Sequence, residues 1–142
     1  MKFDFSLEPV LEVRKHEEKI QKQRLAEKLS RKKDIAARKE KLQLKLKAHI
    51  ERAESSEFNR LHDLRRHRSY ISELHREVEK LEDSLRVVEK AVSQQRDKLA
   101  AVHKERHIME KIKEEEHQVF LEKISREEQK LMDEIATQSY SQ

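Results

Sequence analysis

The chain of 142 residues contains no glycine and no cysteine, and Pro9 is its only proline. Glycine supplies the positive φ angles of tight turns and proline interrupts helices, so a chain with almost neither can be helical over nearly its whole length. The absence of cysteine excludes disulfide bonds and cysteine-ligated metal sites, and it fits a reducing compartment.

Long apolar runs are also missing. Hydrophobic residues make up 35% of the chain and aromatic residues 4%, and no run approaches the roughly 18 residues of a membrane span. The opening residues MKFDFSLEPV lack the apolar segment of a signal peptide. We therefore expect neither a globular core nor a membrane-spanning segment, and we expect a cytoplasmic protein.

Charged residues dominate what is present. They form 44% of the chain, and the 33 lysines and arginines are mixed with 29 aspartates and glutamates. Much of the remainder is Leu, Gln and Ala, which are strong helix formers, as are Glu, Lys and Arg. This composition is typical of coiled coils and predicts an all-α, rod-like protein.

The second half of the chain carries a sustained heptad pattern, as in helices that pair along one seam. Three polar residues interrupt it, at His67, Gln95 and Arg106. The apolar members up to Met109 are Leu64, Ile71, Leu74, Val78, Leu81, Leu85, Val88, Val92, Leu99, Val102 and Met109. The pattern then stretches locally, which unwinds a supercoil, through Ile112, Phe120, Ile124, Leu131 and Ile135.

The first half has a more polar seam. Its apolar members are Leu11, Leu25, Ile35, Leu42 and Leu46. The same seam is interrupted by Arg14, Glu18, Gln21, Lys28, Lys32 and Lys39. Such a stripe does not stabilise a helix by itself, so we expect this helix to pack against a partner helix.

A chain reversal is predicted at about residues 53–58, because this stretch contains two consecutive serines, which favour helix caps over helix interiors. Ser69 is a second candidate for the break. The prediction is a single coiled-coil domain over residues 1–142. It consists of two long helices that form an antiparallel coiled-coil hairpin without a globular core.

The helices of this hairpin are expected at about residues 7–52 and 59–136, followed by a frayed tail at 137–142. The first helix would pair with roughly 58–105, and 106–136 would project beyond the N-terminus. Residues 1–53 carry a net charge of +7 and the remainder −3, which favours the pairing of the two arms.

Signatures of catalysis and metal binding are missing. The chain has no P-loop, no glycine-rich phosphate cradle and no zinc motif. His103 and His107 share a helix face, but no third ligand is evident, and zinc sites need three or four protein ligands. We interpret these histidines as solvated, and we expect no enzymatic activity, no metal and no cofactor.

Two basic segments, at residues 31–33 and 60–68, raise the possibility of nucleic-acid binding through phosphate contacts. Aromatic stacking platforms are scarce, however, and the basic residues alternate with acidic ones. A solvated, salt-bridged face is therefore favoured over a nucleic-acid site.

Three short motifs stand out. They are Phe3-x-Phe5-x-Leu7-Glu8-x-Val10-Leu11-x-x-Arg14 followed by Glu17-Glu18, His67-Arg68-Ser69-Tyr70-Ile71-Ser72-x-Leu74, and Glu127-Glu128-Gln129-Lys130-x-x-Asp133-Glu134-Ile135-Ala136. Together they resemble the N-terminal, middle and C-terminal signatures of the flagellar export protein FliJ family. The resemblance covers the whole chain.

The resemblance implies a non-enzymatic part of the flagellar type III export apparatus, peripherally associated with the inner membrane at the flagellar base. Members of this family look like the central stalk of rotary ATPases. The implied partners are the hexameric export ATPase, which the protein enters and helps to assemble, the membrane-embedded export gate, and empty export chaperones.

By analogy with the rotary stalk, the paired termini would enter the ATPase ring. The resemblance nominates as ATPase-binding residues Phe3, Phe5, Leu7, Arg14, Asp133, Glu134 and Ile135. It nominates Tyr70, Leu74 and Leu81, on one face near the reversal, for contact with the gate. Glu77 departs from the family on that strip, where other members tend to carry a small residue.

Two alternatives remain at this point. One is a structural coiled-coil scaffold, such as a parallel homodimer that spans the full length of the chain. The other is the stalk of a related virulence type III secretion system.

Overall fold

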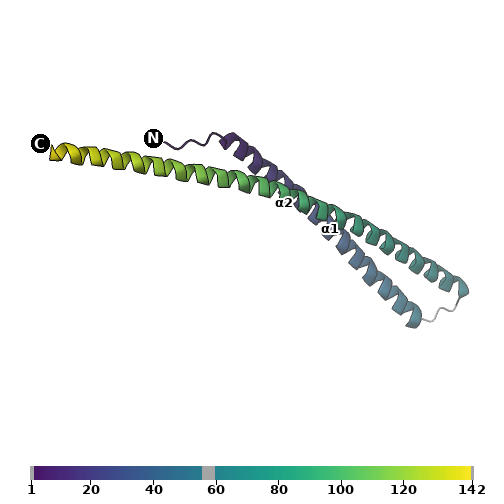
Figure 1. The fold of residues 1–142 in the computed structure, drawn as a ribbon. Coiled ribbons are helices and arrows are strands. Elements are labelled where there is room, and N and C mark those ends of the chain that lie inside the picture. Colours follow the sequence, from purple (N-terminus) through teal and green to yellow (C-terminus); the bar gives the residue numbers. More distant parts are fainter. Residues whose placement is uncertain (1, 56–59, 142) are drawn as a thin grey trace. The chain divides into compact units, whose positions relative to one another are not determined.

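The computed structural model describes residues 2–55 and 60–141. Helix α1 spans Glu8–Ser55 and helix α2 spans Leu61–Tyr140 (Figure 1). The described part of the chain contains no strand. The predicted all-α fold with two long helices is therefore confirmed.

Ion pairs between α1 and α2 establish their direction. In the middle of the chain, Lys32 contacts Glu89, and Lys39, further along α1, contacts Glu82. The order is the same near the start of α1, where Glu8 contacts Lys113 and Arg14 contacts Glu105. A residue further along α1 thus contacts a residue with a lower number on α2. The two helices therefore pair antiparallel, as the hairpin prediction requires.

Helix α1 begins after a turn at Ser6 and Leu7. The amide of Glu8 donates to the carbonyl of Phe5 at 3.1 Å, and the amide of Leu11 donates to the carbonyl of Leu7 at 3.0 Å. Pro9 is accommodated in this first turn because the amides there have no partner within the helix.

The predicted ends near the reversal differ from the observed ones. Helix α1 continues through residues 53–55, and residues 56–58 of the predicted reversal lie outside the described residues. Ala53 and Glu54 are good helix formers, which explains the continuation. Ser69 lies within α2, so the second candidate for the break was wrong.

The predicted frayed tail was also wrong in its position, because α2 continues to Tyr140. The hydroxyl of Thr137 donates to the carbonyl of Asp133 at 2.8 Å, and the amide of Ser141 donates to the carbonyl of Thr137 at 3.1 Å. This stretch contains no glycine or proline that would end the helix at Ala136, and its polar groups bond to the preceding turn.

The chain divides into two compact units. The terminal unit comprises Met1–Ile20 with Leu99–Gln142, and the central unit comprises Gln21–Lys98. In each unit a segment of α1 packs against a segment of α2. The buried apolar side chains of the central unit are Leu46, Leu74, Val78, Val88 and Val92, and those of the terminal unit are Phe5 and Leu11.

Pairing in the terminal unit extends further along α2 than the predicted limit near residue 105. The ring of Phe3 lies 4.8 Å from that of His117 and 5.4 Å from that of Phe120, measured between centroids. Residues 2–5 are not helical and so cover more length per residue than a helix does. Beyond Ile124, residues 125–141 are all exposed.

Candidate functional site

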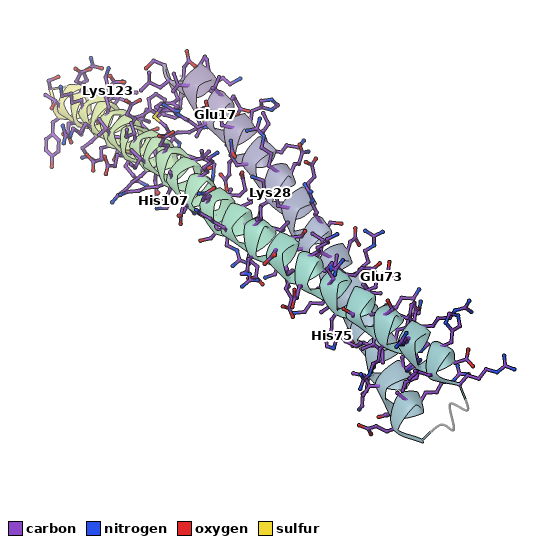
Figure 2. The ribbon with its side chains drawn as sticks, turned by 90° about the vertical axis from the view of Figure 1, so that its right-hand side faces the viewer. Glu17, Lys28, Glu73, His75, His107 and Lys123 are labelled. Carbon is purple, nitrogen blue, oxygen red and sulfur yellow. The ribbon has the colours of Figure 1, made fainter. Side chains whose placement is uncertain are left out.

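A polar layer crosses the seam of the central unit at Gln95, which is 1% exposed. Its amide nitrogen donates to the side-chain oxygen of Gln21 at 2.5 Å and to the Gln21 carbonyl at 3.2 Å. Its amide oxygen accepts from the ammonium of Lys28 at 3.1 Å. Lys28 is labelled on α1 in Figure 2. The residue that interrupts the α2 heptads thus meets two residues that interrupt the α1 seam, and the layer fixes their register.

A charged layer occupies the seam of the terminal unit at Glu18, which is 4% exposed. Its carboxylate pairs with the guanidinium of Arg106 and lies 3.0 Å from Nδ1 of His103. Arg106 also pairs with Glu110 at 2.7 Å. Hydrogen bonds to Glu110 and then to Glu18 raise the pKa of Arg106, against the opposing effect of desolvation.

Flanking ion pairs continue this pattern in both units. Lys32 lies 4.0 Å from Glu89 and Lys39 lies 3.6 Å from Glu82 in the central unit. In the terminal unit, Arg14 lies 2.9 Å from Glu105. All six polar residues that interrupt the predicted α1 seam therefore contact polar groups of α2. The seam selects this antiparallel partner through charge and hydrogen bonding as well as apolar packing.

The four N-terminal residues nominated for ATPase binding have different environments. Phe5 is 4% exposed, and Arg14 is held by Glu105 and Glu17. Phe3 is half-buried against the rings of His117 and Phe120, and Leu7 is exposed. In the terminal unit Leu7 is therefore accessible and Phe3 is partly accessible, whereas Phe5 belongs to the buried core.

The three C-terminal nominees lie on the exposed part of α2. Ile135 is 58% exposed, and Asp133 accepts a hydrogen bond from Gln129 of the same helix at 3.2 Å. The aromatic contacts of Phe3 are with His117 and Phe120, about four helical turns before Ile135. The structure therefore does not bring the N-terminal and C-terminal nominees together.

An apolar stripe continues along α2 beyond its contact with Phe3. Ile124, Leu131 and Ile135 lie on nearly the same helix face as Phe120, because spacings of seven and eleven residues return close to one direction. Leu131 and Ile135 are exposed, and no described residue covers them. Lys123 marks the beginning of this exposed stretch in Figure 2.

The residues nominated for the gate lie in the central unit. Tyr70 is half-buried, its ring centroid 4.8 Å from that of His49, and the ammonium of Lys45 lies 5.7 Å from it. Hydrogen bonding to Tyr70 raises the pKa of Lys45. Leu81 is half-buried, but Leu74 is 3% exposed and packs inside the helix pair. Direct contact through Leu74 would require the two helices to separate.

His103 and His107 have parallel rings 6.4 Å apart. The interpretation of both as simply solvated was incomplete, because Nδ1 of His103 bonds to Glu18. Within residues 2–55 and 60–141, no group of three or more His, Cys, Asp or Glu side chains could hold a metal ion. No described helix is long and apolar enough to cross a membrane.

The buried roles of Glu18 and Gln95 were not assigned from the sequence. The available signal was their position, because each breaks an apolar seam at an a or d site. A polar residue at such a site is either an interruption or half of a specific interhelical pair, and the choice depends on what the other helix places opposite it.

Comparison with known proteins gives one finding. The family model described as Flagellar FliJ protein matches residues 2–142, which is essentially the whole chain. No curated protein and no solved structure gave a match. The family match confirms the resemblance drawn from the three motifs.

Proposed function

Because the chain belongs to the flagellar FliJ family, and so to the components of the flagellar type III export apparatus, we propose that it acts there as a helical stalk for the hexameric export ATPase. In this proposal one end of the protein enters the ATPase ring and promotes its assembly. The protein itself supplies binding surfaces and catalyses no reaction.

The observation that carries the ATPase contact is the apolar stripe on α2 that begins at the half-buried Ile124 and continues through the exposed Leu131 and Ile135. Exposed apolar residues in a row on one helix face are a feature of surfaces that meet another protein. Glu134 lies beside this stripe, whereas Asp133 lies on the opposite side of the helix. Leu7 and Phe3 add accessible apolar surface from the N-terminal segment. Phe5 and Arg14 support this contact indirectly, because they hold the N-terminal segment against α2.

We further propose that Tyr70 and Leu81 contact the export gate, with Leu74 packing behind them. Gate contact would hold the protein at the flagellar base on the cytoplasmic side of the inner membrane. Escort of empty export chaperones belongs to the same proposal and rests on the family alone.

The test is ATP hydrolysis by the cognate export ATPase with and without this protein, with hexamer formation measured in the same samples. The proposal requires faster hydrolysis together with more hexamer. Absence of both effects, combined with absence of co-elution, contradicts it and leaves a structural coiled coil as the better description. Pairing the protein with the ATPase of a virulence secretion system distinguishes the two machines.

A further inference from the structure

A row of basic residues follows the α1 seam of the central unit. It consists of one residue in every seven, all exposed, at Arg24, Arg31, Arg38, Lys45 and Arg52. Lys32 and Lys39, which directly follow Arg31 and Arg38 in the sequence, pair with glutamates of α2. In contrast, neither Arg31 nor Arg38 has an ion pair or hydrogen bond to a described residue.

These two arginines line a groove of about 650 Å³ between α1 and α2. The opposite wall carries the small side chains of Ser84 and Ala91, and Ile35, Leu81 and Val88 contribute apolar surface. The acidic residues of the lining are Asp34 and Asp83, and Asp83 is already held by Arg86 at 2.5 Å. The groove thus offers an apolar surface beside two unpaired guanidinium groups.

The exposed end of α2 has the complementary pattern. Glu127 and Glu134 are seven residues apart, as are Arg31 and Arg38, and both are exposed. They lie at one edge of the stripe formed by Ile124, Leu131 and Ile135, about 40–60° from Leu131 around the helix. Lys123 and Lys130 lie on the same side of the stripe, next to the two glutamates and about 80–100° from Leu131.

The net charges of the two units agree with this match. The central unit has 22 basic and 14 acidic residues, a net charge of +8, and the terminal unit has 11 and 15, a net charge of −4. Opposite charges on the two units favour the approach of the terminal unit of one molecule to the central unit of another.

We propose that residues 121–140 of a second copy of this chain dock as a third helix in the groove beside Arg31 and Arg38. The apolar stripe of the incoming helix faces Ile35, Leu81 and Val88, and Glu127 and Glu134 pair with the two arginines. Arginine suits this role because its planar guanidinium binds a carboxylate through two hydrogen bonds. Docking covers both Leu81 and the stripe assigned to the ATPase, so self-association competes with both contacts.

The test is sedimentation equilibrium of the full-length protein over a range of concentrations and ionic strengths. Wild type should associate reversibly, and more weakly as salt increases. Arg31→Glu with Arg38→Glu should weaken association at least about tenfold, which corresponds to about 1.4 kcal/mol. Glu127→Arg with Glu134→Arg should have a similar effect. A molecule that carries all four changes should regain association, because the charges are exchanged and the apolar surfaces are intact.

Matched controls change the same charges on other faces. One control variant is Lys33→Glu with Lys47→Glu, and the other is Glu115→Lys with Glu122→Lys. All four residues are exposed and lie away from the groove and the stripe, so both variants should associate like wild type. Circular dichroism checks that each variant remains helical. A monomeric wild type at every concentration overturns the proposal and leaves the groove for a different protein. Equal weakening by the controls, or failure of the fourfold exchange to restore association, also overturns it.

Discussion

The side-chain amide of Gln95 on α2 donates hydrogen bonds to both the side-chain oxygen and the main-chain carbonyl of Gln21 on α1. The same amide accepts a hydrogen bond from Lys28. A residue that looks like a flaw in an apolar heptad is therefore the centre of a satisfied polar layer. Such layers stabilise one register of two helices relative to the alternatives, because a shift leaves buried polar groups unpaired.

Replacement of this glutamine gives the first prediction. Gln95→Ala removes three hydrogen bonds and leaves a void beside Gln21, so we expect the free energy of unfolding to fall by about 1–3 kcal/mol. Urea unfolding followed by circular dichroism measures it. Gln129→Ala is the control, because Gln129 is exposed and bonds only within α2. Equal effects of the two substitutions would mean that the polar layer contributes little.

The second prediction compares a buried acid with an exposed one that also contacts the other helix. Glu18→Gln removes the buried carboxylate that Arg106 meets in the seam and leaves this guanidinium only its partly exposed partner Glu110, so it should cost about 2–3 kcal/mol of unfolding free energy. Glu105→Gln breaks a half-exposed pair with Arg14 and should cost less than about 1 kcal/mol. Chemical unfolding of the two variants in parallel tests this order, and a larger loss for Glu105→Gln would contradict it.

The third prediction concerns pH. A hydrogen bond from Lys113 is the main cause that lowers the pKa of Glu8 below its ordinary value of 4.5. Because the folded-state pKa is lower than the unfolded one, the contribution of Glu8 to stability is fully present above about pH 4.5 and is lost as the pH falls through the lowered value.

Unfolding measurements on wild type and Glu8→Gln across this range isolate that contribution from those of the other carboxylates. The difference between the two proteins should be small, because the pair is partly exposed, and it should shrink toward zero at the acidic end. A difference that stays constant with pH would show that Glu8 acts through packing rather than through its charge.

The fourth prediction separates stability from ATPase contact. Ile135→Asp alters an exposed position of the apolar stripe and should leave helicity and the unfolding transition unchanged. It should reduce stimulation of the export ATPase several-fold, because a carboxylate in an apolar contact is desolvated without a partner. Val119→Asp provides the control, since Val119 is equally accessible but lies off the stripe. Loss of stimulation in both variants would argue for a general charge effect.

Several features could be predicted from the sequence because they depend on local chemistry. Without glycine, and with Pro9 only in the first turn, the chain contains almost nothing that ends a helix, and two long helices follow from that. The same absence explains why the predicted helix end at Ala136 was too early. The polar seam of the first half correctly indicated that its helix needs a partner.

Other features depended on which residues meet across the helices, and only the tertiary structure decided them. Glu18, Gln95 and Arg106 are interruptions in their own helices and become partners only when antiparallel pairing places them opposite polar groups. Leu74, expected at a docking surface, is enclosed by the helix pair, whereas Ile135 is exposed and no described residue covers it. Periodicity determines which face of a helix is apolar, but the length and register of the partner determine how much of that face is covered.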